Sequence, residues 1–251
     1  QHRAAGGKLI WTLHNLTAHN CPHKQAEQLC RRGLVQRADA IHIMADRHRA
    51  ALPEGGSTKA TVIAHPSYAQ HYPKTAKPAA RAKLGLGDKP LFFHFGAARS
   101  NRAYSVLQDP TVNNPAVDKI LSIPGSAQTV NQAGIRLLDR RLSDAELGLI
   151  GSAADFSIFA DSGMLNSGTL GFYLDFGMMV FLERAAIEWM DLPGYPEELI
   201  FDSALDTQRM NTLLADVGLR RRMEIFLQAR AERVCPERVS SRFAQLVRSV
   251  R

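Results

Sequence analysis

Cysteine is scarce in this sequence, and the three cysteines form no close pair. They are Cys21, Cys30 and Cys235, an odd number without any Cys-x-x-Cys spacing. A disulfide framework needs an even, patterned set of cysteines, and a structural zinc site needs closely spaced ligands. We therefore expect a chain that works in a reducing compartment such as the cytoplasm.

Long apolar runs are also missing. No stretch approaches the roughly 20 apolar residues that span a bilayer, and no charged-then-apolar signal follows Gln1. The hydrophobic fraction of 45% and the charged fraction of 22% are typical of a globular protein that is not integral to a membrane. The absence of a starting Met is expected of a processed or truncated chain.

Acidic residues are fewer than basic ones, which gives a formal net charge of +7. This favours an anionic partner, which is a nucleotide, a nucleic acid or a lipid headgroup surface. No aromatic-studded basic stretch supports nucleic acid. Arginines at helical spacing fill residues 209–251, and they form either a solvated helix face or a peripheral contact with the inner face of an anionic membrane.

Short apolar segments alternate with helical patterns along the whole chain, which predicts an α/β fold with mostly parallel sheets. Strands are expected at residues 8–13, 40–44, 61–64, 91–95, 119–123, 134–138, 156–159, 179–182 and 199–201. Helices are expected between them, including 102–108, 143–153 and 169–176. The helix 143–153 opens with a capping box from Ser143 to Glu146.

A proline- and lysine-rich stretch divides this alternation into two Rossmann-like blocks. We expect an incomplete first domain at residues 1–70, a linker at 71–86, a complete doubly wound parallel sheet at 87–235 and a basic carboxy-terminal helix at 236–251.

The strand at 91–95 leads into a first candidate site. Gly96 permits a tight turn at the carboxyl end of the strand, where open α/β sheets bind ligands. Arg99 and Arg102 follow, and guanidinium groups suit bidentate contact with phosphate oxygens. Either arginine is otherwise an ordinary surface residue.

The start of the helix at 169–176 is a second candidate. Asn166, Ser167, Gly168 and Thr169 bring small side chains to a helix amino terminus, whose unpaired N–H groups and positive dipole end can receive a diphosphate. The alternative is that Asn166 or Ser167 is only an N-cap.

A metal site is not expected. His14, His19 and His23 surround Cys21, but their spacing is loose and crosses from a strand through a loop to a helix. Structural zinc sites have a more compact ligand pattern.

Taken together, several short segments make the chain resemble the GT-B glycosyltransferases, particularly those that build bacterial exopolysaccharides and other surface glycans. The segments lie at residues 11–15, 38–41, 65–68, 95–99, 123–125, 142–147, 153–155 and 166–169.

The resemblance implies roles for the candidate residues. Arg99, Arg102 and the helix start at Ser167, Gly168 and Thr169 would hold the diphosphate of a nucleoside-diphosphate sugar. His14, at the end of a first-domain strand, would face the cleft as a catalytic residue. The implied activity is transfer of a hexose to a glycan or lipid-linked acceptor, with no cofactor and no metal.

The chain departs from the family at one place. Many retaining members carry two glutamates eight positions apart, and the matching positions here are Met164 and Phe172. The stereochemical outcome therefore stays open, and a non-catalytic or degenerate sugar-nucleotide-binding module is the alternative function.

Overall fold

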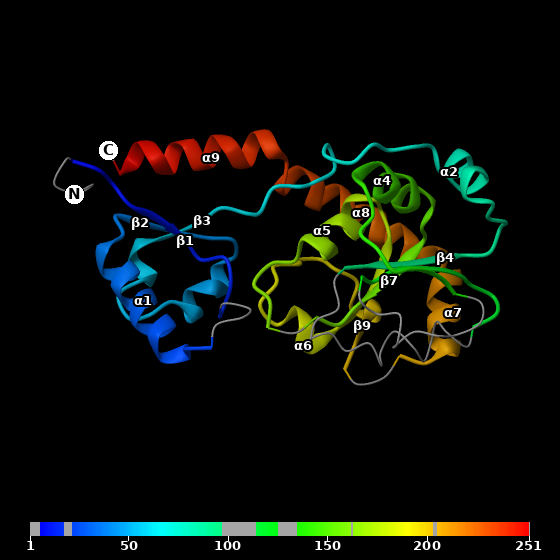
Figure 1. Ribbon diagram of the computed structural model, residues 1–251, viewed down its shortest axis with the longest axis horizontal. Coiled ribbons are helices and arrows are strands. Elements are labelled where there is room, and N and C mark those ends of the chain that lie inside the picture. Colours follow the sequence, from blue (N-terminus) through cyan, green and yellow to red (C-terminus); the bar gives the residue numbers. More distant parts are fainter. Residues whose placement is uncertain are drawn as a thin grey trace.

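The computed structural model describes residues 6–17, 22–96, 114–124, 135–161, 163–202 and 205–250. Two parallel sheets lie in two domains, and Figure 1 shows these domains side by side. The chain passes between them twice, and the two passages touch where the backbone N–H of Ser67 donates to the carbonyl of Val234 at 2.8 Å. The predicted α/β class with two Rossmann-like domains is confirmed.

The smaller domain contains a three-stranded parallel sheet in the order β1-β2-β3. Its elements are β1 (Ile10–Thr12), α1 (Lys24–Arg37), β2 (Ala40–Ile43), the 3-10 turns η1 (Asp46–Ala51) and η2 (Ser57–Lys59), and β3 (Ala60–Val62). These strands match the expected ones to within a few residues.

Both faces of the smaller sheet are covered. Ile41 and Ile43 of β2 pack with Val35 of α1 on one face, whereas Ala40 packs with α9 (Pro236–Ser249) on the other. This alternation follows from the two-residue period of a strand. The carboxy-terminal helix, expected as a separate unit, thus returns to the smaller domain (Figure 1).

In the larger domain the described residues form a six-stranded sheet, with all strands paired in parallel, in the order β6-β5-β4-β7-β8-β9. The strands are β4 (Leu91–Phe95), β5 (Asp118–Ser122), β6 (Arg136–Leu138), β7 (Phe156–Phe159), β8 (Met179–Glu183) and β9 (Ile200–Phe201). The helices are α2 (Lys77–Leu84), α4 (Asp144–Ala153), α5 (Gly168–Asp175), α6 (Arg184–Ile187), the 3-10 turn η3 (Glu197–Leu199), α7 (Thr207–Ala215) and α8 (Val217–Arg233).

This strand order is that of a doubly wound Rossmann sheet, counted from β4 as the first strand. The order reverses between β4 and β7, and the crevice outside the carboxyl ends of these two strands is where such sheets bind ligands. Gly96 follows β4, and α5 follows β7. The topology therefore brings Gly96 and the start of α5 to the same switch point.

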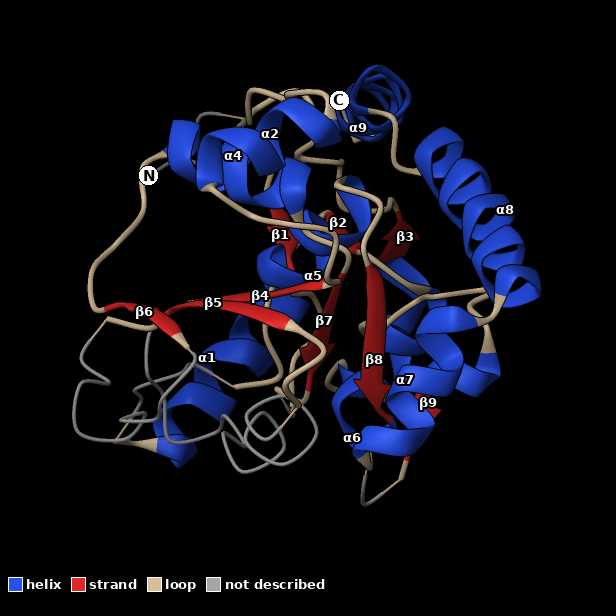
Figure 2. Ribbon diagram, turned by 90° about the vertical axis from the view of Figure 1, so that its right-hand side faces the viewer, coloured by secondary structure: helices blue, strands red, loops and turns tan. Residues whose placement is uncertain are grey.

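The segment 71–86, expected as a linker, contributes to the larger domain. Its helix α2 packs against α4, as Figure 2 shows, and Ala80 is fully buried in the core of that domain. The part of the segment before α2, residues 71–76, is neither helix nor strand.

Several local predictions are confirmed. Strands β4 and β7 have the predicted bounds, and α4 has the predicted capping box between Ser143 and Glu146. The expected helix 102–108 lies outside the described residues. Within the described ranges, none of the helices combines the length and apolarity that a bilayer crossing requires.

Candidate functional site

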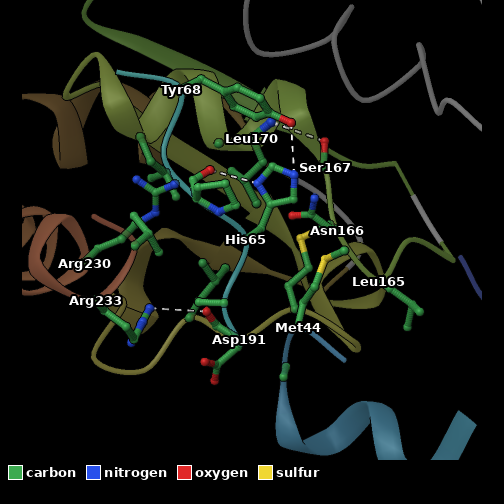
Figure 3. A pocket seen from close by; sticks show the side chains of 18 of the residues that line it. Met44, His65, Tyr68, Leu165, Asn166, Ser167, Leu170, Asp191, Arg230 and Arg233 are labelled. Atoms are coloured by element: carbon green, nitrogen blue, oxygen red, sulfur yellow. Dashed lines mark hydrogen bonds between the residues drawn. The ribbon is translucent and has the colours of Figure 1, made fainter. Parts of the chain in front are cut away.

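A pocket opens where the two domains meet (Figure 3). The smaller domain contributes Met44 and His48, and α8 contributes Arg230 and Arg233. The segment that leads from β3 to α2, residues 63–76, is called the crossing segment here, and it contributes His65, Pro66 and Tyr68. The rest of the wall comes from the loop before α5, from α5 itself and from residues 190–192, and it includes Leu165, Asn166, Ser167, Leu170 and Asp191. Two of the predicted site residues, Asn166 and Ser167, are therefore in this pocket.

The first turn of α5 begins with the capping serine that the sequence offers as the alternative to a phosphate ligand. Ser167 is the N-cap, and its hydroxyl accepts the backbone N–H of Leu170 at 3.2 Å. The side chain is only 5% exposed, so its hydroxyl serves the helix. The N–H groups of Gly168 and Thr169 have no acceptor within the helix. They and the dipole can bind an anion, while Ser167 fixes the helix start.

Tyr68 is in van der Waals reach of the glycines of α5. A Cβ added at Gly168 would lie 3.7 Å from the Tyr68 ring, and a Cβ at Gly171 would lie equally close. Tyr68 therefore lies over the first turns of α5. Thr169 is half-buried and is not among the residues that line the pocket.

The end of β4 lies beside α5. The Phe95 and Phe172 rings are 4.8 Å apart, and the backbone N–H of Phe95 donates to the Tyr173 hydroxyl at 3.2 Å. Gly96 has a φ of 135°, a conformation that favours glycine, and its N–H donates to the carbonyl of Ser122 at 2.9 Å. Arg99 and Arg102 lie outside the described residues, so their roles stay predictions.

His14 follows β1 at its carboxyl end and is exposed. Its ring centroid lies 6.4 Å from that of His65 in an edge-on arrangement. His14 is not one of the pocket-lining residues, although its neighbour His65 is one. Its catalytic role stays a prediction.

Sequence reasoning gave no role to His65 and Tyr68, although both belong to a segment that carries the family resemblance. His65 Nδ1 lies 2.8 Å from the carbonyl oxygen of Pro66, and its Nε2 lies 3.1 Å from the Tyr68 hydroxyl. Burial lowers the pKa of His65 and raises the pKa of Tyr68. Both groups are therefore neutral near pH 7.

A buried carboxylate holds this segment in place. Asp175, at the end of α5, accepts the backbone N–H of Tyr68 at 2.7 Å and the guanidinium of Arg230 at 2.5 Å. Lys74 donates to the backbone carbonyl of Asp175 at 2.7 Å. One residue thus joins the crossing segment, α5 and α8.

The domains also touch on the other side of the pocket. The ring of His48 is fully buried, and its Nε2 lies 2.8 Å from the carbonyl oxygen of Trp189. Arg47 donates to the carbonyl of Glu188 at 2.9 Å. Burial lowers the pKa of His48, which keeps an uncharged imidazole between the domains.

The two positions that match the glutamates of many retaining GT-B enzymes hold apolar side chains here. Phe172 is 1% exposed and packs among Phe93 and Phe95 in the core of the larger domain, and Met164 packs against the same core. Neither side chain provides a carboxylate.

Across the described ranges, no three His, Cys, Asp or Glu side chains gather closely enough to hold a metal ion. His19 and Cys21 lie outside these ranges. The expectation of a metal-free, cofactor-free protein stays a prediction.

No protein-family model matches the chain, and no curated protein sequence matches it. Solved structures do match. HepE of Anabaena in complex with UDP is 16% identical, with a TM-score of 0.74 over 98% of this chain and 74% of that chain. The same protein in complex with UDP-glucose gives a TM-score of 0.71.

A sucrose-phosphate synthase of Thermosynechococcus elongatus is 15% identical, with a TM-score of 0.72 over 97% of this chain and 68% of that chain. An α,α-trehalose-phosphate synthase of Burkholderia xenovorans is 13% identical, with a TM-score of 0.68 over 99% of this chain and 70% of that chain. At these identities the likeness concerns the fold. Together with the Rossmann strand order and the pocket between two domains, it shows that this chain has the GT-B fold that its sequence predicted.

Proposed function

We propose that this chain is a glycosyltransferase that uses a nucleoside-diphosphate sugar. The observation that carries the proposal is the position of the α5 amino terminus, which lies at the switch point of the larger sheet and borders a pocket between the domains. A diphosphate placed there meets unpaired N–H groups and the positive end of the helix dipole. Stabilising the charge on a departing nucleoside diphosphate is a strong form of catalysis.

UDP is the proposed nucleotide, because the HepE structures with which the fold agrees contain UDP or UDP-glucose. Arg99 and Arg102 are proposed to complete the diphosphate site from the β4 side, next to Gly96. His14 is proposed to approach the acceptor hydroxyl from the smaller domain. The transferred group is proposed to be a hexose.

For the acceptor we propose a glycan or lipid-linked oligosaccharide of exopolysaccharide assembly. The protein would then work in the cytoplasm, at the inner face of the membrane. The arginines of α8 and α9 support this setting, since Arg221, Arg238 and Arg248 are exposed and attract anionic headgroups. Catalysis is proposed to need neither a metal nor a cofactor.

Calorimetric titration with UDP, GDP and their sugars tests donor binding. Asn166→Asp places a negative charge on the pocket wall and is expected to weaken UDP binding by about tenfold or more through repulsion of the diphosphate. Gln208→Glu, on the exposed surface of α7 away from the pocket, adds the same charge and should leave binding unchanged. Equal effects of the two variants would place the nucleotide elsewhere.

A second function, a non-catalytic sugar-nucleotide-binding module, is favoured by one observation: Phe172 is locked in the core where many retaining relatives carry a glutamate. Release of UDP from UDP-glucose in the presence of bacterial glycolipid extract distinguishes the two. Acceptor-dependent release supports the transferase, whereas tight binding without turnover across a broad acceptor set supports the module.

A further inference from the structure

The hydrogen bonds of His65 fix which of its nitrogens carries the proton. Nδ1 faces the carbonyl oxygen of Pro66 at 2.8 Å, and a carbonyl oxygen only accepts, so Nδ1 is the protonated nitrogen. Burial lowers the pKa of the ring, and the nearby charges of His14 and Arg230 lower it further, against the opposing effects of the Pro66 hydrogen bond and Asp175. In the neutral ring Nε2 is then an acceptor.

This tautomer determines the direction of the next hydrogen bond. Tyr68 must donate its only hydroxyl proton to Nε2 of His65, across 3.1 Å. Within the described part of the chain, the phenol makes no other hydrogen bond. Its oxygen is therefore left with lone pairs alone.

The backbone of Tyr68 is held as firmly as its hydroxyl. Asp175 accepts the Tyr68 N–H at 2.7 Å, and the ring lies over Gly168 and Gly171, where a Cβ would approach it to 3.7 Å. Figure 3 shows the hydroxyl above the His65 ring, on the side of the pocket formed by Ser167 and Leu170. The phenolic oxygen is thus a fixed acceptor next to the α5 amino terminus.

A fixed acceptor distinguishes between ligand groups. A phosphate oxygen has no proton to donate and is repelled by the lone pairs, whereas a sugar hydroxyl can donate to them. The diphosphate has donors available at the N–H groups of α5. The neighbouring phenolic oxygen is suited to the part of the ligand that carries hydroxyls.

We propose that Tyr68, oriented by His65, is a specificity-determining residue that accepts a hydrogen bond from one hydroxyl of the donor sugar. This inference rests on the proposed function and adds to it the residue that recognises the sugar. His65 and Asp175 are positioning residues, since they act through Tyr68.

Calorimetric titration of wild type and of Tyr68→Phe tests the proposal. The ligands are UDP, UDP-glucose and a set of UDP-glucose analogues, each with one glucose hydroxyl replaced by fluorine. Tyr68→Phe is expected to weaken UDP-glucose about tenfold, the loss of one hydrogen bond to a partner left unpaired. The affinity of the variant for UDP should stay within about twofold of that of wild type, a change well below the loss of one hydrogen bond.

One fluorinated analogue should bind wild type about tenfold more weakly than UDP-glucose does. The Tyr68→Phe variant should bind this analogue and UDP-glucose with equal affinity, because the fluorine and the substitution remove the same hydrogen bond. Tyr72→Phe is the matched control. Tyr72 lies in the same segment, its ring 5.0 Å from that of Phe172, and it does not line the pocket.

The outcomes separate the two proposals. If wild type binds no UDP, the proposed UDP-dependent function fails. Two other outcomes would contradict the role of Tyr68 but not the nucleotide site. In the first, Tyr68→Phe weakens the binding of UDP and UDP-glucose equally. In the second, every analogue that binds wild type more weakly than UDP-glucose also binds Tyr68→Phe more weakly than UDP-glucose. Melting temperatures of the variants identify any loss of affinity that comes from unfolding.

Discussion

Nη1 of Arg230 lies 2.5 Å from Oδ1 of Asp175, and the two side chains are only 11% and 3% exposed. The second carboxylate oxygen accepts the backbone N–H of Tyr68. An ion pair this deeply buried costs desolvation, and it is favourable only when its remaining hydrogen-bonding capacity is used. Here the pair determines how the crossing segment meets α5 and α8.

Asp175→Ala is expected to lower the free energy of unfolding by about 3–5 kcal/mol, because it leaves the Arg230 guanidinium buried without its partner and removes the acceptor of the Tyr68 N–H. Urea titration followed by circular dichroism measures this change. Arg230→Met on the Asp175→Ala background should restore part of the loss, since it removes the unpaired charge.

The surface pair of Arg221 and Glu224 is the control. It has a similar geometry, at 3.0 Å, but side chains that are 74% and 64% exposed. Glu224→Ala should change the unfolding free energy by no more than about 0.5 kcal/mol. A comparable loss in both single variants would mean that burial of the Asp175 pair has no energetic consequence.

Much of the fold could be predicted from the sequence because the strands of the larger sheet are short, continuous apolar runs. The runs at β4 and β7 are buried on both faces and gave their bounds without error. The predicted strand 8–13 is longer than β1, because an apolar run indicates which residues are buried and not where strand pairing ends. Leu13 is 1% exposed yet lies just beyond the strand.

The candidate site was only partly predictable. Ser167 was found because a helix start has a local signature of small capping residues. Tyr68 and Arg230 had none, since they meet Asp175 across sequence separations of 107 and 55 residues. Such contacts depend on how two domains and a returning helix pack, and no local pattern encodes them.

Two glycines inside helices are expected to respond oppositely to the same substitution. Alanine is favoured over glycine in a helix interior by about 1 kcal/mol. At Gly33 of α1 the nearest atom to an added Cβ is 3.9 Å away, so Gly33→Ala should raise the melting temperature. At Gly148 of α4 the Cβ would overlap the backbone carbonyl oxygen of Pro73.

Gly148→Ala should therefore lower the unfolding free energy by roughly 1–3 kcal/mol, the usual cost of overpacking, by separating α4 from the segment before α2. Differential scanning calorimetry of both variants provides the comparison. A stabilising Gly148→Ala would show that α4 and Pro73 are not in contact in solution.

Acid should destabilise the protein through two buried histidines. His42 Nε2 lies 2.8 Å from the Ile63 carbonyl oxygen, and His48 Nε2 lies 2.8 Å from that of Trp189; burial is the main cause that lowers the pKa of each. In the unfolded chain both have a pKa near 6.5. Below that pH the unfolded state binds protons that the folded state does not, so stability falls as the pH falls.

The loss begins near pH 6.5 and amounts to at most about 1.4 kcal/mol per pH unit for each histidine, levelling off below the pKa values of the folded state. Urea titrations between pH 8 and 5 should show this slope. His42→Gln and His48→Gln keep an N–H donor but cannot titrate, so each should flatten it. An equal slope in wild type and in both variants would mean that folding does not change the proton affinity of either ring.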